Sequence, residues 1–406
     1  MNRLAPLDGM RGYFLVFMML NHLIFTGGLM LVKLNHGELG YVQDAQGFVF
    51  LSGLLIGLVY ARQMQKNGYA PAATKIRRRA FELYRWALIC IFGIIAVGFL
   101  LPQSHVFWNN WLDRLAHNDP GFMVAAASLL FQPVFMDILP QYIVYLLVAP
   151  PLVWLCITGR AWYVALGSGF LWLAVQLGLH LPLRDAIDGT LAALWPGLRL
   201  QAHFNIFAWQ VVFMSGLVLG SLTAVKAIDW KAVLSPEKPQ FAVAALGFLV
   251  LFAIVRLMIV YGPMPEAIVE RIGSRDVRGE FSLQYLVNFA VLGYLIAWLM
   301  VAGVRSANPV AAMAGRGLHR LFTLPFLQLI GRHSLQVYVW HVFVVYMVRA
   351  IDQSVAPMSE PVKTAIALTA IASLAIPALW RERATWFGSA PAPVPAKAPA
   401  KQARSA

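Results

Sequence analysis

The sequence predicts an all-α polytopic membrane protein of about ten transmembrane helices, with both termini in the cytoplasm. Three observations predict this class: 60% of the 406 residues are hydrophobic, only 12% are charged, and apolar segments recur along the chain. Soluble domains carry about 25% charged residues, so this composition excludes an ordinary soluble enzyme. We assign residues 1–385 to one transmembrane domain.

Ten apolar segments are near the roughly 20 residues that cross a bilayer. They are 10–32, 44–61, 83–101, 140–158, 161–180, 205–225, 241–261, 283–304, 327–350 and 362–380. The apolar stretch 122–136 is shorter and contains Pro133, so we expect a re-entrant or surface helix there. Residues 386–406 are rich in Pro and Ala and cannot build a core, which predicts a disordered cytoplasmic tail.

The distribution of Lys and Arg predicts the orientation of these segments. Most of the basic residues outside the segments fall on the side of the two termini, which the positive-inside rule assigns to the cytoplasm. Loops 102–139, 181–204 and 262–282 are then outside. Cytoplasmic loops account for the net charge of +14, so we expect no nucleic-acid partner. The two cysteines show no metal-binding spacing, and we expect neither a metal nor a tightly bound cofactor.

Ionisable side chains interrupt the first apolar segment. Arg11 and His22 fall on one face of a helix, roughly 16 Å apart along its axis. Asp8 lies one turn before Arg11, within reach of an ion pair. Such residues usually face a protein interior or a wet cavity and mark a site. Histidine titrates near neutrality, so His22 suits a general base for an attacking hydroxyl; the alternative is a buried histidine bonded to a neighbouring helix.

Polar residues lie where the second segment begins. We expect Asn21, Asp44 and Gln46 near the outer end of the spans, where a hydroxyl-rich acceptor would arrive. The alternative for Asp44 is a solvated helix start that it caps. We place Ser52 on the acceptor side as well, although it stands among glycines that allow close helix packing, and that structural role is its alternative.

Basic residues on the cytoplasmic side suit the phosphates of a nucleotide-bearing acyl donor. The candidate donor-binding residues are Arg77, Arg78, Arg79, Arg85 and Arg332. The alternatives are a topology determinant that touches anionic lipid and, for Arg332, a cation that reaches the interface. His341, about 13 Å further into the ninth segment, is a candidate on the acceptor side.

The first of these motifs, Leu7 to Gly12 followed by His22, resembles the first-helix Arg-x10-His motif of acyltransferase-3 type membrane proteins. The stretch 50–56, Phe-Leu-Ser-Gly-Leu-Leu-Ile, is similar to their Phe-x-x-Ser-Gly-x-x-Ile signature. Residues 331–341 resemble their late Gly-Arg-x-Ser-x-x-x-Tyr-x-x-His element. Within this superfamily, the shape of 41–62 and the absence of an added soluble domain look most like the OpgC branch.

The resemblance implies succinyl transfer from acyl-CoA, a co-substrate from the cytoplasm, to osmoregulated periplasmic glucans. It also implies a location in the bacterial inner membrane. His22 matches the catalytic histidine, Arg11 its motif partner, and Ser52 and Arg332 the later signatures. Alternatives are an acyltransferase for another envelope glycan, a transporter of an anionic metabolite, and a structural subunit. A transporter would be favoured by paired half-sequences of inverted topology, which are not evident.

Overall fold

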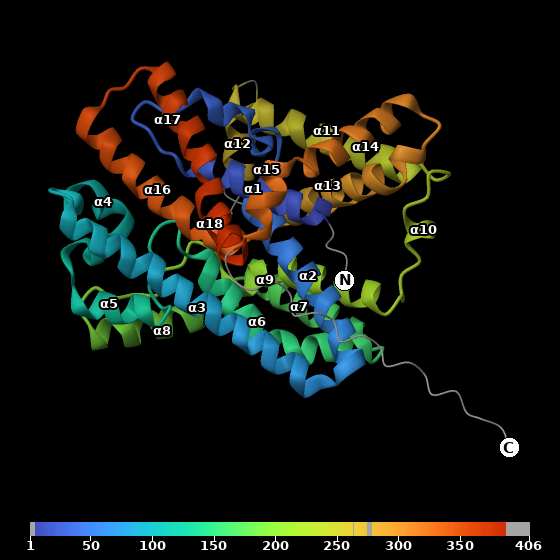
Figure 1. Cartoon of the computed structure of the whole chain (residues 1–406), viewed down its shortest axis with the longest axis horizontal. Coiled ribbons are helices and arrows are strands. Elements are labelled where there is room, and N and C mark those ends of the chain that lie inside the picture. Colours follow the sequence, from blue (N-terminus) through green and yellow to red (C-terminus); the bar gives the residue numbers. More distant parts are fainter. Residues whose placement is uncertain (1–4, 263, 274–277, 387–406) are drawn as a thin grey trace.

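The computed structural model describes residues 5–262, 264–273 and 278–386, and most of these residues are helical (Figure 1). These ranges contain no β-strand, only an isolated bridge between Phe131 and Gln201. The predicted all-α class is therefore confirmed. The predicted disordered tail lies almost wholly at 387–406, outside the described residues.

The elements follow one another in the order shown in Figure 1. The longer helices are α1 (Ala5–His22), α2 (Asp44–Asn67), α3 (Tyr69–Leu100), α6 (Ile138–Ile157), α7 (Ala161–Gln176), α8 (Leu181–Leu194), α9 (Ile206–Ala224), α11 (Gln240–Val260), α13 (Leu283–Val301), α14 (Pro309–Phe322), α16 (Ser334–Val355), α17 (Glu360–Ser373) and α18 (Ala375–Trp386). The shorter elements are η1 (Met30–Leu34), η2 (His36–Leu39), α4 (Ser104–Leu112), η3 (Asp113–His117), α5 (Pro120–Ala127), α10 (Trp230–Val233), α12 (Glu266–Gly273), η4 (Gly303–Arg305) and α15 (Pro325–Arg332).

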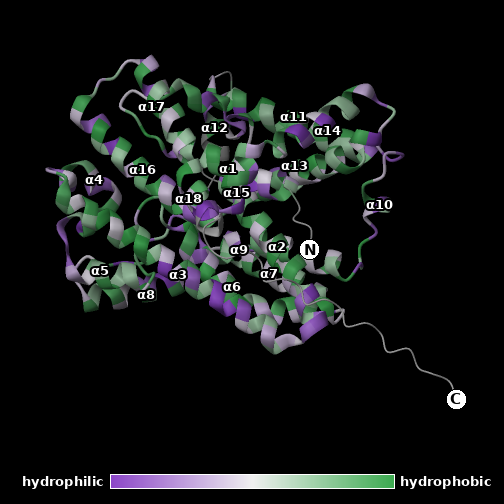
Figure 2. Cartoon of the chain, in the orientation of Figure 1, coloured by the Kyte–Doolittle hydropathy of each residue, from purple (hydrophilic) through white to green (hydrophobic). Residues whose placement is uncertain are grey.

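Eight helices among the described residues are long and apolar enough to cross a membrane. The pair α7 and α8, bent by 72°, would make a ninth span, and it replaces the straight helix predicted over 161–180. Figure 2 shows hydrophobic residues along most long helices and hydrophilic residues where α2 meets α3. The remaining predicted span, the first segment 10–32, corresponds to α1, whose polar residues lower its hydropathy. The count of ten and the orientation of the termini therefore remain predictions.

Three predicted helices differ in extent from the apolar pattern. The first segment, 10–32, is helical only to His22, and the chain continues through turns and the short elements η1 and η2. His22 consequently lies at the end of its helix, not partway along it. The ninth segment, 327–350, is divided at His333 into α15 and α16. In the third case, 122–136, only the short helix α5 forms, and the chain from Ser128 to Asp137 is irregular.

Helix α2 packs against α9 through glycines on both helices. A Cβ atom at Gly53 would lie 2.0 Å from the carbonyl oxygen of Phe213, and one at Gly216 would lie 2.3 Å from the carbonyl oxygen of Phe50. No side chain fits at these distances, so the two backbones are in direct contact. This confirms the small-residue face predicted for the second segment.

Helix α1 is held against α15 by the same kind of contact. A Cβ atom at Gly12 would lie 2.0 Å from the carbonyl oxygen of Leu327, and one at Gly331 would lie 1.8 Å from that of Asp8. Since α16 begins directly after α15, this packing fixes where α1 presents Arg11 and His22 to α16. The late Gly-Arg motif thus has a structural role in placing the first helix.

Candidate functional site

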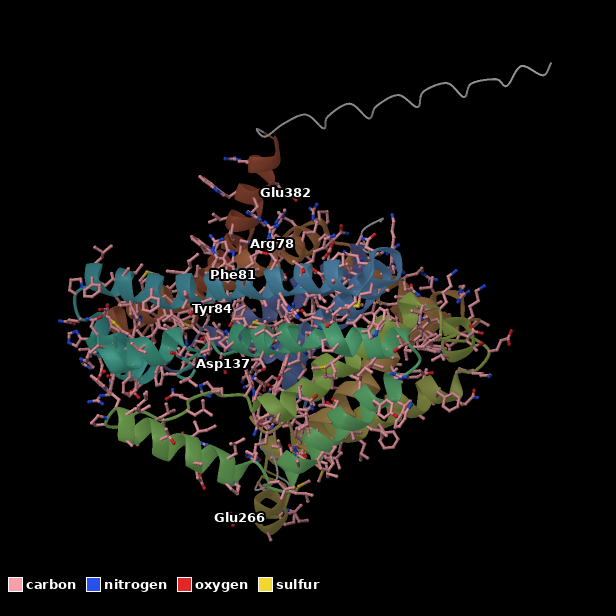
Figure 3. The ribbon with its side chains drawn as sticks, turned by 90° about the horizontal axis from the view of Figure 1, so that it is seen from below. Arg78, Phe81, Tyr84, Asp137, Glu266 and Glu382 are labelled. Carbon is pink, nitrogen blue, oxygen red and sulfur yellow. The ribbon has the colours of Figure 1, made fainter. Side chains whose placement is uncertain are left out.

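Two cavities share the side chain of Tyr338. The larger, which we call the His22 cavity, has a volume of about 640 Å³. Its polar lining includes Asn21, His22, Asn35, Glu38, Gln43, Asp44, Asp137, His203, Arg256 and Arg278. The smaller, which we call the Arg79 cavity, has a volume of about 140 Å³ and a lining that includes Arg11, Ser52, Arg79, Tyr142 and Ser334. Figure 3 shows Arg78 and Glu382 toward one side of the molecule, Glu266 at the opposite side and Asp137 between them.

His22 is hydrogen-bonded to a second histidine, His341 of α16. The distance from Nδ1 of His22 to Nε2 of His341 is 3.0 Å. His341 is fully buried, and its Nδ1 lies 2.5 Å from the backbone carbonyl oxygen of Tyr338. Two residues that are 319 positions apart in the sequence therefore meet at the wall of the His22 cavity.

This chain of hydrogen bonds assigns the tautomers of both imidazoles. A carbonyl oxygen can only accept, so Nδ1 of His341 carries a proton and donates it to Tyr338. In a neutral imidazole the other nitrogen is then an acceptor, so Nε2 of His341 accepts from Nδ1–H of His22. Nε2 of His22 is left with a lone pair, and no hydrogen bond to it occurs within the described residues. The arrangement is suited to proton acceptance at Nε2.

The irregular chain before α6 completes the wall around His22. The ring of Phe135 stacks on the imidazole of His22, with centroids 4.2 Å apart. The hydroxyl of Tyr338 donates to the backbone carbonyl of Phe135 at 2.6 Å, and that of Tyr346 donates to Val134 at 3.1 Å. Because these bonds satisfy the backbone of a non-helical segment, they allow it to lie inside the helical bundle.

Asp44 forms a second polar cluster at the start of α2. Its Oδ2 accepts from Nδ2 of Asn21 at 2.6 Å and from Nδ2 of Asn35 at 3.4 Å. Burial lowers the pKa of His36 to about 4, so its 3.8 Å approach to Asp44 involves a neutral ring at pH 7. The other oxygen of Asp44, Oδ1, is buried and has no hydrogen-bond partner in the described part of the chain. It can accept a hydrogen bond from a ligand.

Arg11 faces the Arg79 cavity, on the other side of Tyr338 from His22. Its Cζ lies 5.4 Å from the centroid of the Phe48 ring, and its buried Nε has no hydrogen-bond partner among the residues that the structure describes. Asp8 is close enough to Arg11 to act on its charge. The face of α1 that carries Arg11 and His22 thus lines one cavity with Arg11 and the other with His22.

A family model described as OpgC protein matches residues 3–386, nearly the whole chain. The chain belongs to the OpgC family. Searches of curated proteins and of solved structures give no significant match. Family membership suggests an acyltransferase related to osmoregulated periplasmic glucans, and the apolar helices suggest a multi-pass membrane protein.

The structure places the candidate donor residues of this OpgC protein in different surroundings. Arg79 lines the Arg79 cavity and forms an ion pair with Glu82 at 2.6 Å. Arg77, Arg78 and Arg85 are exposed on α3. Arg332 forms an ion pair with Glu382 at 3.1 Å. Of these five arginines, Arg79 is the one that lines either of the two cavities defined above.

The acceptor-side candidates also divide between the two cavities. Asn21 and Asp44 line the His22 cavity, and His341 contacts it through His22. Ser52 lies instead at the Arg79 cavity, where its hydroxyl donates to the backbone carbonyl of Phe48 at 3.0 Å. Gln46 is fully buried. Its Nε2 donates to the backbone carbonyl of Tyr41 at 3.2 Å, and its Oε1 accepts from the backbone N–H of Gln43 in the capping box of α2.

Sequence reasoning missed several polar residues of the His22 cavity. They are Asn35, Glu38, Asp137, His203, Arg256 and Arg278. Asp137 is 5% exposed, and its Oδ2 is buried with no hydrogen-bond partner in the described ranges. One signal was available for Arg256, because it is the single charged residue of an otherwise apolar segment. The others lie in connecting segments, where polar residues are ordinary.

Proposed function

We propose that this protein is a membrane-embedded O-acyltransferase of the bacterial inner membrane. It moves a succinyl group from cytoplasmic acyl-CoA to hydroxyl groups of an osmoregulated periplasmic glucan. Family membership supports the class of reaction, and two cavities that share one wall suit two substrates. The observation that carries the proposal is the hydrogen-bonded pair of His22 and His341, which leaves Nε2 of His22, a residue that lines the larger cavity, as the proton acceptor.

In the proposed step, the acceptor hydroxyl oxygen attacks the thioester carbonyl carbon while Nε2 of His22 takes the hydroxyl proton. A C–O bond forms, the C–S bond breaks, and the sulfur leaves with the electron pair. The proton on His22 then passes to the thiolate, which restores the base and releases free CoA. His341 keeps the imidazole of His22 oriented through the bond to Nδ1.

The acceptor is proposed to enter the His22 cavity. Sugar hydroxyls can donate to the partnerless oxygens of Asp44 and Asp137, and a sugar ring can pack against the aromatic surface of Phe135. The donor is proposed to enter the Arg79 cavity, where Arg11 and Arg79 line the approach to Tyr338. Arg77, Arg78 and Arg85 would hold its phosphates near the surface, and Arg332 would join them if it exchanged its partner Glu382.

The test compares periplasmic glucans from cells with the gene, without it, and with a His22→Ala copy. Only the wild-type gene should add the mass and the negative charge of succinyl groups. Loss of a general base typically lowers a rate by about 10²–10⁴-fold, so glucans from the His22→Ala cells should be almost unmodified. His117→Ala, on an exposed histidine away from both cavities, is the matched control and should retain modification.

The amount of protein in the membrane fraction is measured for each variant, so that failed insertion is separated from failed catalysis. Normal modification by His22→Ala would remove His22 from the mechanism. Unchanged glucans in all strains would contradict the proposed acceptor, and labelled acyl-CoA with other envelope glycans would then test the alternative acceptor. Transport of an anionic metabolite without any acyl transfer would replace the enzyme assignment.

A further inference from the structure

Helix α11 carries a charge in surroundings where charges are rare. It is the most apolar of the eight candidate spans, and most of it is exposed on the surface of the protein, where lipid would lie. Arg256 is the single charged residue between Gln240 and Val260. A guanidinium on such a helix is unfavourable unless it faces a polar interior. Arg256 is half-buried and lines the His22 cavity.

A second arginine, Arg278, lines the same cavity from the segment before α13. Its Cζ is 5.9 Å from the ring centroid of Phe204, and Arg256 is 5.8 Å from that of Tyr41. Within the described ranges, neither arginine forms an ion pair within 4.0 Å with a carboxylate. The buried Nε of Arg256 also has no hydrogen-bond partner there. The cavity therefore presents two guanidinium groups without a close counter-ion.

Three carboxylates line the cavity, those of Glu38, Asp44 and Asp137, and none forms an ion pair with either arginine in the described chain. Asp44 and Asp137 are close enough to Arg278 to interact with its charge, yet each keeps a buried oxygen without a hydrogen-bond partner in the described chain. A ligand that offers hydroxyl donors to the aspartates and an anion to the arginines would satisfy both sets of groups. A neutral sugar offers hydroxyl donors to the aspartates but no anion to the arginines.

We propose that Arg256 and Arg278 bind the free carboxylate of a dicarboxylic acyl group during its transfer. This inference rests on the acyl transfer proposed above and identifies the residues that select the acyl group. Guanidinium groups match a carboxylate in geometry and charge, and are less strongly hydrated than ammonium groups. Arg278 and His22 line the same cavity, which places the anion site near the proposed reaction centre.

The experiment uses the purified full-length protein in proteoliposomes, with one neutral glucan as acceptor. Succinyl-CoA is compared with butyryl-CoA, whose acyl chain is similar but ends in a methyl group where succinyl has a carboxylate. Wild type should favour succinyl-CoA in kcat/KM. In Arg256→Gln, kcat/KM for succinyl-CoA should fall by about 10- to 100-fold, since a hydrogen bond to a charged group is lost. Its value for butyryl-CoA should change by less than about threefold.

Two further variants control this comparison. Arg278→Gln should also lower the ratio of kcat/KM for succinyl-CoA to kcat/KM for butyryl-CoA. The conclusion then does not depend on one substitution in a membrane helix. Arg184→Gln, on an exposed arginine of α8, should leave the ratio unchanged. An equal loss of transfer with both donors would overturn the inference, because the arginines would then bind something other than the acyl carboxylate.

The same assay separates this inference from the proposed function. Equal use of both donors by wild type would overturn the carboxylate site but leave acyl transfer standing. Transfer from neither donor, with protein that is folded and inserted, would overturn the proposed acyltransferase and the carboxylate site together. An anionic group on the natural acceptor is the competing ligand, and it predicts that Arg256→Gln impairs charged acceptors equally with either donor.

Discussion

His341 shows how one side chain can fix the chemistry of another. Its proton on Nδ1 is committed to the carbonyl of Tyr338, so only Nε2 can meet His22. A histidine with a free choice of tautomer would present an N–H to the cavity for part of the time. Replacing His341 by a residue without a hydrogen-bond acceptor should therefore disturb the tautomer of His22 without changing a contact to either substrate. His341 is a positioning residue in this scheme.

We expect His341→Leu to lower kcat by about 10- to 100-fold, by analogy with the loss of a partner that orients a metal-bound histidine. The KM for acyl-CoA should change little, because His341 lines neither cavity. His341→Gln, whose amide oxygen can accept from Nδ1–H of His22, should restore part of the rate. Steady-state kinetics of both variants make the test. A rise in KM with unchanged kcat, or equal loss in both variants, would contradict the orienting role.

Residues of the candidate site differ in how well the sequence reveals them. Arg11 and His22 are conspicuous because an ionisable side chain inside an apolar segment needs a reason. Asp137 is not, because an aspartate before a helix resembles an ordinary cap, and its open oxygen appears only when the surrounding chain is placed. His22 and His341 are 319 residues apart in the sequence, and no local sequence pattern predicts a contact between residues so far apart.

At the scale of helices, the glycines of α2 and α9 make a prediction about stability. In Gly53→Ala, the new methyl group would overlap the carbonyl oxygen of Phe213, so the helices must separate. Overpacking of this kind typically lowers the free energy of unfolding by about 1–3 kcal/mol. Gly247→Ala on α11 is the control, since nothing lies within 4 Å of its added Cβ. The measurement is the midpoint of thermal unfolding in detergent.

The expected order is a lower midpoint for Gly53→Ala and an unchanged or slightly higher midpoint for Gly247→Ala. Replacing glycine by alanine within a helix reduces the conformational freedom of the unfolded chain, which favours the control variant. Equal midpoints for Gly53→Ala and wild type would mean that α2 and α9 can move apart without a loss of stability. The glycine of the Phe-x-x-Ser-Gly signature would then need a different explanation.

Helix positions were more predictable than helix ends. Hydropathy located each of the long apolar helices, because about 20 apolar residues in a row have few other stable environments. It did not indicate that α1 ends at His22 or that His333 separates α15 from α16. Apolar residues resume after the polar residues at both points, so the sequence is equally consistent with one continuous helix. The ends depend on packing, such as the contact of Gly331 with Asp8.

At the scale of the whole molecule, the distribution of charge agrees with the two-cavity arrangement. Arg78 and Glu382 lie toward one side of the molecule, and Glu266 lies on the opposite side (Figure 3). A donor that carries phosphates and an acceptor from the periplasm would approach from these two sides. The proposal therefore requires that the side of Arg78 faces the cytoplasm, as the excess of Lys and Arg predicts.

Cysteine labelling tests this orientation directly. The two native cysteines, Cys90 and Cys156, are both buried, so they should give little background. We introduce Arg78→Cys and Glu266→Cys, which replace exposed residues on opposite sides. A membrane-impermeant maleimide added to spheroplasts should label Glu266→Cys at least about tenfold more than Arg78→Cys, because a charged reagent does not cross the bilayer.

Lysis before labelling is the internal control and should bring Arg78→Cys to the level of Glu266→Cys, since both positions are exposed. The reverse pattern in intact spheroplasts would place the Arg79 cavity toward the periplasm. Acyl-CoA made in the cytoplasm could not then reach that cavity from the side of Arg77 and Arg78. The assignment of donor and acceptor to the two cavities would have to be exchanged, or the acyl donor would have to be something other than CoA.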